Sequence, residues 1–241
     1  MTKHDVKHDA ALAGVGSMAT RPLLATLAGQ YERETGQRLA IAALGGVDAA
    51  RRVAAGEAFD FAVLASAAID RLAAGGHLVG ARIDVVRSGM AAAVASGAAH
   101  PDIGTEGALR ETVLRAARIG YSTGPSGDHL LGLLERWGVA EAVRPRLVKA
   151  QPGVPVATLI ANGEVELGFQ QLSELKDVQG VDVIGPLPAG AQLVTVFSAA
   201  VCAVTQQWQA ANGFLAFLAS DRTEATKRAF GMEPAGAADL R

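Results

Sequence analysis

Hydrophobic residues recur with two different periods along the first 80 positions. Three short apolar runs predict strands, at Ala10–Val15, Arg38–Ala43 and Phe59–Leu64. Three segments with apolar residues at helical spacing predict helices, at Arg21–Thr35, Asp48–Ala55 and Ala67–Gly75. Gly36 is the expected end of the first helix, and Asp48 the expected N-cap of the second. Strands that alternate with helices are typical of a parallel sheet covered by helices on its faces.

Two longer extended runs, Asp84–Ser96 and Leu193–Val204, interrupt this rhythm. The portion between them has strands and helices of its own, among them Arg118–Ser122, His129–Trp137, Val156–Asn162, Val165–Phe169 and Val181–Ile184. After the second run, Gln206–Ser220 predicts a helix with Trp208 facing inward. We interpret the two runs as crossovers between two lobes. Residues 1–85 with 195–241 would form the first lobe, and residues 86–194 the second, inserted lobe. The predicted fold class is α/β, with two Rossmann-like lobes and a hinge of two crossover strands.

The composition excludes several classes of function. Half of the 241 residues are hydrophobic and 19% are charged, which is typical of a globular chain with a core. The net charge is −2 and no run of Lys or Arg forms a basic stripe, which argues against a nucleic-acid partner. Cys202 is the only cysteine, so neither a disulfide within the chain nor a thiolate zinc site can form. Its apolar surroundings predict a buried thiol, and no metal site is expected.

The N-terminal ten residues lack the apolar stretch of a secretory signal, and the chain has no apolar run long enough to cross a bilayer. The chain as written is therefore expected in the cytoplasm. A periplasmic location is the alternative, if the sequence is a trimmed form of an exported protein.

Three predicted strands end in turns rich in small or polar residues, and each turn leads into a helix. These turns contain Gly16-Ser17-Met18, Gly45-Gly46-Val47 and Ser122 to Gly127. In open α/β sheets, ligands bind beyond the carboxyl ends of strands, where helix N-termini present free N–H groups to anions. The competing interpretation is that the serines, Ser17 and Ser126 among them, are ordinary helix caps.

Other polar residues near these turns are weaker candidates. Arg21 begins a helix, and a cation at this end is disfavoured by the helix dipole. A bound anion would explain why an arginine occupies this position. Gln170 and Gln171 follow a predicted strand and could offer neutral donors. Asp128 and His129 could support proton transfer, although we favour a structural role for both. The Gly14-x-Gly16 pair lacks the third glycine of a dinucleotide fingerprint, and no phosphate loop or nucleophile elbow occurs, so no cofactor is expected.

The order of these pieces resembles the substrate-binding proteins of molybdate-type ABC transporters, which have the type 2 periplasmic binding protein fold. The residues that carry the resemblance are Ser17-Met18, Phe59 to Leu64, Ile119 to Ser122 with Pro125-Ser126-Gly127, and Gly163 to Phe169. The resemblance implies a ligand held in the inter-lobe cleft by neutral hydroxyls and backbone N–H groups. It assigns that role to the residues of four turns, namely Ser17, Gly46, Val47, Ser126, Gly127, Gly153 and Val154.

The chain also departs from that pattern in two places. The hydroxyl of the second turn is lost at Gly46-Val47, and the family's tyrosine is replaced by Gln170-Gln171. These departures disfavour molybdate and favour a larger or planar carboxylate. The stretch from Gly168 to Leu175 is more similar to the aconitate-isomerase-like subset of the superfamily.

Two functions therefore stay open. One is a solute-binding protein for a small oxyanion or a di- or tricarboxylate, with an ABC transporter permease as its partner if it is exported. The other is a cofactor-independent isomerase of a small unsaturated carboxylate. In the second case no catalytic base is identified, and Asp128, His129 and Glu174 are the candidates.

Overall fold

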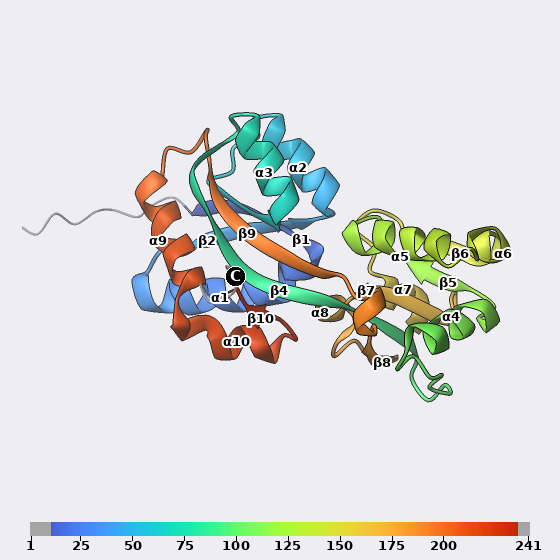
Figure 1. Cartoon of the computed structure of the whole chain (residues 1–241). Coiled ribbons are helices and arrows are strands. Elements are labelled where there is room, and N and C mark those ends of the chain that lie inside the picture. The colour runs from blue at the N-terminus through green and yellow to red at the C-terminus, as the bar shows by residue number, and fades with distance from the viewer. Residues whose placement is uncertain (1–10, 236–241) are drawn as a thin grey trace, which may run out of the picture. The chain divides into compact units, whose positions relative to one another are not determined.

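The computed structural model describes residues 11–235. The start of the first predicted strand, at Ala10, and the N-terminal segment that bears on location lie outside the described residues. The chain divides into two compact units. Among the described residues, unit 1 contains 11–85, 197–227 and 235, and unit 2 contains 86–196 and 228–234. Each unit is a sheet covered by helices (Figure 1).

Unit 1 alternates strands and helices along its first part. Its strands are β1 (Leu12–Ser17), β2 (Leu39–Leu44) and β3 (Phe61–Ala65). Its helices are α1 (Arg21–Thr35), preceded by the 3-10 turn η1 (Met18–Thr20), α2 (Gly46–Ala54), α3 (Ser66–Ala74) and α9 (Trp208–Ala219), which η4 (Asp221–Thr223) follows. Two long strands, β4 (Leu78–Ala95) and β9 (Val194–Cys202), and helix α10 (Glu224–Ala229) contribute residues to both units.

Parallel pairing brings the carboxyl ends of three strands to one edge of the unit 1 sheet. The strand order is β2-β1-β3-β9, with β1 parallel to both β2 and β3. Ser17 lies opposite Leu44, and Gly16 lies opposite Val63. The turns that follow β1, β2 and β3 therefore share this edge.

The two faces of the unit 1 sheet have different cores. Helices α2 and α3 pack on one face, around Val15 and Ile69, and α1 and α9 lie on the other (Figure 1). On the α9 face the Phe61 ring packs against Phe214, with 5.1 Å between ring centroids. A Cβ on Gly14 would lie 2.2 Å from the Phe61 ring, so this glycine is required for packing. The Gly14-x-Gly16 pair thus has a structural explanation.

Unit 2 repeats the arrangement with shorter strands. Its strands are β5 (Ile119–Tyr121), β6 (Leu147–Lys149), β7 (Leu167–Gln171), β8 (Val181–Pro186) and β10 (Glu233–Pro234). Its helices are α4 (Glu106–Arg115), α5 (Pro125–Arg136), α6 (Ala140–Val143), α7 (Val156–Ala161) and α8 (Leu172–Leu175), with 3-10 turns η2 (Arg144–Arg146) and η3 (Ala189–Ala191). The sheet order is β4-β7-β5-β6, and β5 runs parallel to β6 and β7. The carboxyl ends of β5, β6 and β7 therefore share one edge.

Strand β4 divides its side chains between the two cores of unit 2. Met90, Ala92 and Val94 join the core beneath α4 and α5, whereas Ala91 and Ala93 join the core beneath α7. This alternation is the period of 2 that a strand buried on both faces imposes. It explains why the segment is continuously apolar in the sequence.

Several sequence expectations are corrected by the structure. Helix α5 begins at Pro125 rather than His129, because proline suits the first helical position. Strand β7 continues through Gln170 and Gln171 instead of ending before them. The N-cap of α2 is Gly45, and Asp48 lies in the first turn, where it pairs with Arg51.

Two more expectations concern single side chains near the end of the chain. Trp208 begins α9 and is 54% exposed, so it does not face inward. Cys202 is buried as expected, and burial together with the charge of Asp60 raises the pKa of its thiol to about 12.

Residues 228–234 group with unit 2, whereas the sequence placed them in the first lobe. Strand β10 supplies the reason, because Glu233 and Pro234 pair with Arg87 and Val86 of β4. No helix within residues 11–235 is long and apolar enough to cross a membrane.

Candidate functional site

The carboxyl edge of unit 1 carries Ser17 at the end of β1. Ser17 is buried, and its hydroxyl lies 3.4 Å from that of Thr20, which itself donates to the Ser17 carbonyl at 3.0 Å. Ser17 does not cap the following turn with its side chain, and Thr20 does not cap α1. Ser17 is therefore not an ordinary side-chain cap, and its hydroxyl faces that of Thr20 instead. Met18, next in the chain, is partly exposed.

Arg21 lies beside this turn, at the first position of α1. It is exposed and lines a cavity of about 390 Å³, together with Gly16, Leu24 and Ala43. Within the described part of the chain, Arg21 has no ion-pair partner, and the first turn of α1 holds no acidic residue. An unpaired cation at a helix N-terminus opposes the helix dipole. A cation in this position is well placed to neutralise an anion in the cavity.

The turn after β2 presents backbone and apolar groups instead of a hydroxyl. Gly46 begins α2 with open space around it, and Val47 is 73% exposed. A side chain as apolar as valine gains by contacting carbon atoms of a ligand rather than water.

The turn after β5 brings two hydroxyl groups together at the N-terminus of α5. Ser122 and Ser126 are joined by a hydrogen bond of 2.8 Å between their side-chain oxygens. Gly127 follows, and a Cβ there would lie only 1.9 Å from the Ser122 carbonyl oxygen. Glycine is thus obligatory for the tight return of the chain from β5 into α5. The sequence identified Ser126 and Gly127 but gave Ser122 no role.

The turn after β6 contains Val154, and Gln170 fixes the helix that follows it. Val154 is 37% exposed. The Val156 N–H in the first turn of α7 donates to Gln170 Oε1 at 2.7 Å, and Gln170 Nε2 donates to Glu174 Oε1 at 2.7 Å. Gln170 is only 3% exposed, so it is a buried bridge between α7 and α8.

Glu174 is the most strongly perturbed carboxyl group at this edge. Although the residue as a whole is only partly buried, its carboxyl group lies deep enough for desolvation to raise its pKa to about 7, against the opposing effect of the bond from Gln170. A carboxyl group with a pKa near neutrality is able both to accept and to release a proton.

Gln171 points to the opposite face of β7 and has an incomplete set of partners. Its Nε2 donates to the Thr195 hydroxyl at 2.8 Å, while its buried Oε1 has no hydrogen-bond partner in residues 11–235. Nearby polar groups are also buried, with Ser88 and Ser173 at 3.5 Å from each other. Thr195 had no signal in the sequence, because its partner is distant along the chain.

Asp128 and His129 do not form a catalytic pair in this structure. Asp128 is exposed in the first turn of α5, and His129 Nε2 lies 2.8 Å from the Ala191 carbonyl oxygen. This bond ties α5 to η3, so the ring nitrogen serves the structure, in agreement with the interpretation favoured from the sequence.

Unit 1 contains a further polar chain that the sequence did not identify. The Ser66 and Ser198 hydroxyls lie 2.9 Å apart, and Ser198 donates to Asp84 at 2.6 Å. Ser66 directly follows β3 at the carboxyl edge, which is the signal that could have found it.

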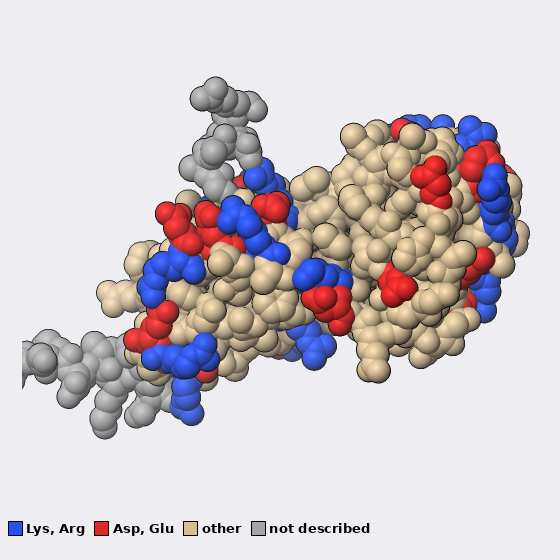
Figure 2. Space-filling model, turned by 90° about the horizontal axis from the view of Figure 1, so that it is seen from below, with Lys and Arg blue, Asp and Glu red and all other residues tan. Residues whose placement is uncertain are grey.

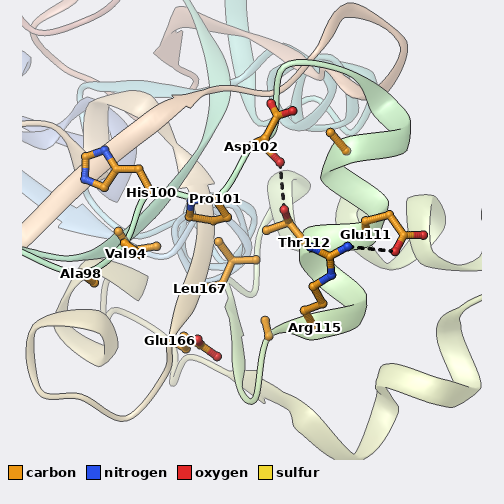
Figure 3. Close-up of a pocket in the computed structure, with 13 residues that line it drawn as sticks. Val94, Ala98, His100, Pro101, Asp102, Glu111, Thr112, Arg115, Glu166 and Leu167 are labelled. Atoms are coloured by element: carbon orange, nitrogen blue, oxygen red, sulfur yellow. Dashed lines mark hydrogen bonds and ion pairs between the residues drawn. The ribbon is translucent and has the colours of Figure 1, made fainter.

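A second cavity, of about 500 Å³, lies at the other edge of the unit 2 sheet (Figure 3). Val94 and Leu167 form part of its apolar wall, and Glu111, Arg115 and Glu166 lie around it. Arg115 pairs with Glu111 at 3.7 Å. The cavity adjoins the amino end of β7, away from the edge where open α/β sheets bind ligands, and its acids outnumber its one arginine. It is a poorer anion site than the carboxyl edge.

Charges of both signs are interspersed on the described surface that Figure 2 shows. No continuous basic stripe is visible there, and no cluster of three or more His, Cys, Asp or Glu among residues 11–235 is arranged to hold a metal ion. The carboxyl edge of each unit is therefore the best candidate binding surface of that unit. We call the residues of these two edges half-site 1 (Ser17, Met18, Arg21, Gly46 and Val47) and half-site 2 (Ser126, Gly127, Val154, Gln170 and Gln171).

Solved structures of other proteins share this fold. The periplasmic molybdate-binding protein of Azotobacter vinelandii superposes with a TM-score of 0.78 at 19% identity, over 92% of this chain and 98% of that one. The sulfate-binding protein of Mycobacterium tuberculosis gives a TM-score of 0.75 at 16% identity, over 95% and 88%. These similarities define the class as the periplasmic binding protein fold.

Sequence comparison defines the family. Residues 12–233 match the model of the bacterial extracellular solute-binding proteins, and this chain belongs to that family. An aconitate isomerase of Pseudomonas sp. is 35% identical over 231 residues, which cover 92% of this chain and 86% of that protein. The prediction of a two-lobed α/β binding-protein fold is confirmed.

Proposed function

We propose that this protein binds a small di- or tricarboxylate through the turns at the carboxyl edges of its sheets. The observation that carries the proposal is that neutral and cationic donors and an exposed apolar side chain lie in neighbouring turns at one edge of the unit 1 sheet. Ser17 and Arg21 supply a hydroxyl and a charge after β1, and Val47 is exposed in the turn after the neighbouring strand β2. An inorganic oxyanion has no carbon atoms for Val47 to cover, whereas a carboxylate has both kinds of surface.

The other candidate residues take roles in this proposal according to their partners. Met18, Gly46, Ser126, Gly127 and Val154 would contact the ligand through backbone N–H groups, the Ser126 hydroxyl or apolar surface. Gln170 and Gln171 use their amide nitrogens inside unit 2, so we propose that they act by positioning the turns around them. The 35% identity to an aconitate isomerase supports an organic anion over molybdate or sulfate.

A thermal-unfolding screen tests this proposal. A ligand that binds only the folded protein raises the unfolding midpoint in proportion to the logarithm of its concentration. We expect trans-aconitate, tricarballylate or citrate at millimolar concentration to raise the midpoint by several degrees, and molybdate and sulfate at equal ionic strength to leave it unchanged. A shift with molybdate alone would contradict the choice of a carboxylate.

A second candidate function is isomerisation of an unsaturated carboxylate without a cofactor. The specific observation in its favour is Glu174, whose pKa of about 7 suits proton transfer near neutral pH. A solute-binding protein of the transporter type would have an ABC transporter permease as its partner, whereas an isomerase needs no partner protein. Proton NMR of trans-aconitate incubated with the protein separates the two, since a receptor returns the ligand unchanged and an isomerase produces the cis isomer.

A further inference from the structure

We infer that Glu174 is the group that transfers the proton in an allylic isomerisation, and that Gln170 is the positioning residue that holds it at the α7 turn. This inference rests on the second candidate function above. It assigns a chemical step to an acidic side chain at the edge of the unit 2 sheet where the proposed ligand binds.

The geometry places the Glu174 carboxyl group beside the turn that contains Val154. Gln170 bonds both the first-turn N–H of α7 and Glu174 Oε1, each at 2.7 Å, so one rigid amide spans the helix start and the carboxyl group. Gln170 is 97% buried, which fixes its own orientation. The structure gives Glu174 Oε2 no hydrogen-bond partner among the described residues, whereas Oε1 accepts from Gln170. One oxygen is therefore held, and we assign the contact with the substrate to the other.

The elements that pack around Glu174 bring no unpaired charge close to its carboxyl group. Helix α8 packs against α7, β7 and β8. The segments Val156–Ala161 and Leu167–Gln171 carry no charged side chain. On β8, Asp182 is held by Ser96 and His100, and next to α8, Lys176 is paired with Asp177. Burial raises the pKa of Glu174 and the hydrogen bond from Gln170 lowers it, with no contribution from a neighbouring charge.

The proposed step moves one proton and one double bond. Glu174 Oε2 removes a proton from the methylene carbon next to the double bond, so a C–H bond breaks and an O–H bond forms. The electron pair spreads over three carbon atoms and onto the adjacent carboxylates, where hydrogen-bond donors of half-site 2 would stabilise the charge. The same carboxyl group then returns the proton to the far carbon, and the double bond has shifted. No oxidant, reductant or cofactor enters this balance.

Gln170 explains how one carboxyl group can serve both halves of the reaction. A bond donated to Oε1 favours the ionised form, whereas burial favours the neutral form, and the two effects leave the pKa near the working pH. A group with a pKa near the ambient pH both takes and returns a proton efficiently.

The test compares the wild type with Glu174→Gln, Glu174→Asp and the control Glu135→Gln, which changes an exposed acid on α5. Each protein is incubated with trans-aconitate in D2O, and conversion and deuterium incorporation are followed by NMR. Ligand binding is measured in a separate experiment, from the rise in the unfolding midpoint that the ligand causes. We expect Glu174→Gln to lose at least about 1000-fold in kcat while ligand affinity changes by less than about threefold. Glu174→Asp should retain partial activity, and the low-pH limb of its kcat profile should move to lower pH.

Gln170→Leu tests the positioning role. It should lower kcat and shift the acidic limb of the pH profile upward, because the bond that favours the ionised form is removed. A Glu174→Gln enzyme within about fivefold of an active wild type would overturn the role of Glu174 and leave the isomerase function standing. A wild type that binds trans-aconitate but neither converts it nor exchanges its protons would overturn the isomerase function and this role together, with carboxylate binding unaffected.

Discussion

At the scale of single residues, Asp60 is the buried acid that fixes the start of the unit 1 sheet. Its carboxylate accepts bonds from the Ala13 N–H at 2.8 Å, the Thr205 hydroxyl at 2.5 Å and Gln207 Nε2 at 3.2 Å. A carboxylate with three donors compensates for its own desolvation. It also joins β1 to the segment that precedes α9.

We expect Asp60→Ala to lower the free energy of unfolding by about 2–4 kcal/mol, because three donors lose their acceptor at a site that is 7% exposed. Asp70→Ala is the matched control, since the Asp70 side chain is 59% exposed in its pair with Arg82 and should cost less than about 1 kcal/mol. Urea unfolding followed by circular dichroism measures both. Equal losses in the two variants would refute this role of Asp60.

Glu174 makes a prediction about stability as well as chemistry. Its pKa is raised from 4.5 to about 7 in the folded protein, so the native state binds this proton more tightly than the unfolded state does. The contribution of Glu174 to the free energy of unfolding is fully present below about pH 4.5 and is lost as the pH rises through about 7. Glu174→Gln should remove that loss, and at pH 8 it should be more stable than the wild type by about 1–3 kcal/mol.

Urea midpoints at pH 4.5 and pH 8 check this prediction. The difference between variant and wild type should be close to zero at the lower pH and should grow at the higher one. A constant difference at both values would mean that Glu174 titrates normally in the folded protein.

At the scale of elements, helix α5 contains two glycines with opposite expected responses to alanine. Gly127 has no room for a Cβ, which would lie 1.9 Å from the Ser122 carbonyl oxygen, whereas nothing lies within 4 Å of a Cβ at Gly132. Gly127→Ala should therefore lower the unfolding midpoint strongly, by about 2 kcal/mol or more in free energy, because backbone must move. Gly132→Ala should raise stability by about 0.5–1 kcal/mol, since alanine favours a helix interior.

Thermal unfolding of the two variants measures this contrast in a single helix. Should Gly127→Ala prove neutral, the tight turn from β5 into α5 is not as the structure describes it. Gly127→Ala should also weaken ligand binding, because this turn belongs to half-site 2.

The sequence predicts the elements better than it predicts their ends. Periodicity located Arg21–Thr35 within unit 1 correctly, because its apolar stripe and Gly36, at φ 76°, are local signals. It ended β7 too early, since Gln170 and Gln171 look like loop residues. Their burial depends on Val156, Glu174 and Thr195, which supply hydrogen bonds from elsewhere in the chain. Partners distant in sequence leave no local pattern.

The same limit applies to the candidate site. Ser17 and Ser126 were found because small polar residues after strands are a local signal. Ser66 was missed, although it follows β3, because its importance lies in a bond to Ser198 that is 132 positions away. The perturbed pKa of Glu174 also comes from burial, which the sequence does not display.

At the scale of the whole molecule, membership of the solute-binding family fixes the fold but leaves the ligand to be determined by the turns. In the turn after β2 the chain exposes Val47.

The central claim is that a carboxylate binds through neutral and cationic donors in half-site 1. Isothermal titration of tricarballylate, an unreactive tricarboxylate, into the wild type, Ser17→Ala, Arg21→Gln and the remote control Ser96→Ala tests it most directly. We expect micromolar affinity for the wild type and the control, and losses of about tenfold or more for the two half-site variants, since a bond to a charged group contributes about 1.5–3 kcal/mol. Equal affinities in all four proteins, or tighter binding of molybdate than of tricarballylate, would contradict the claim.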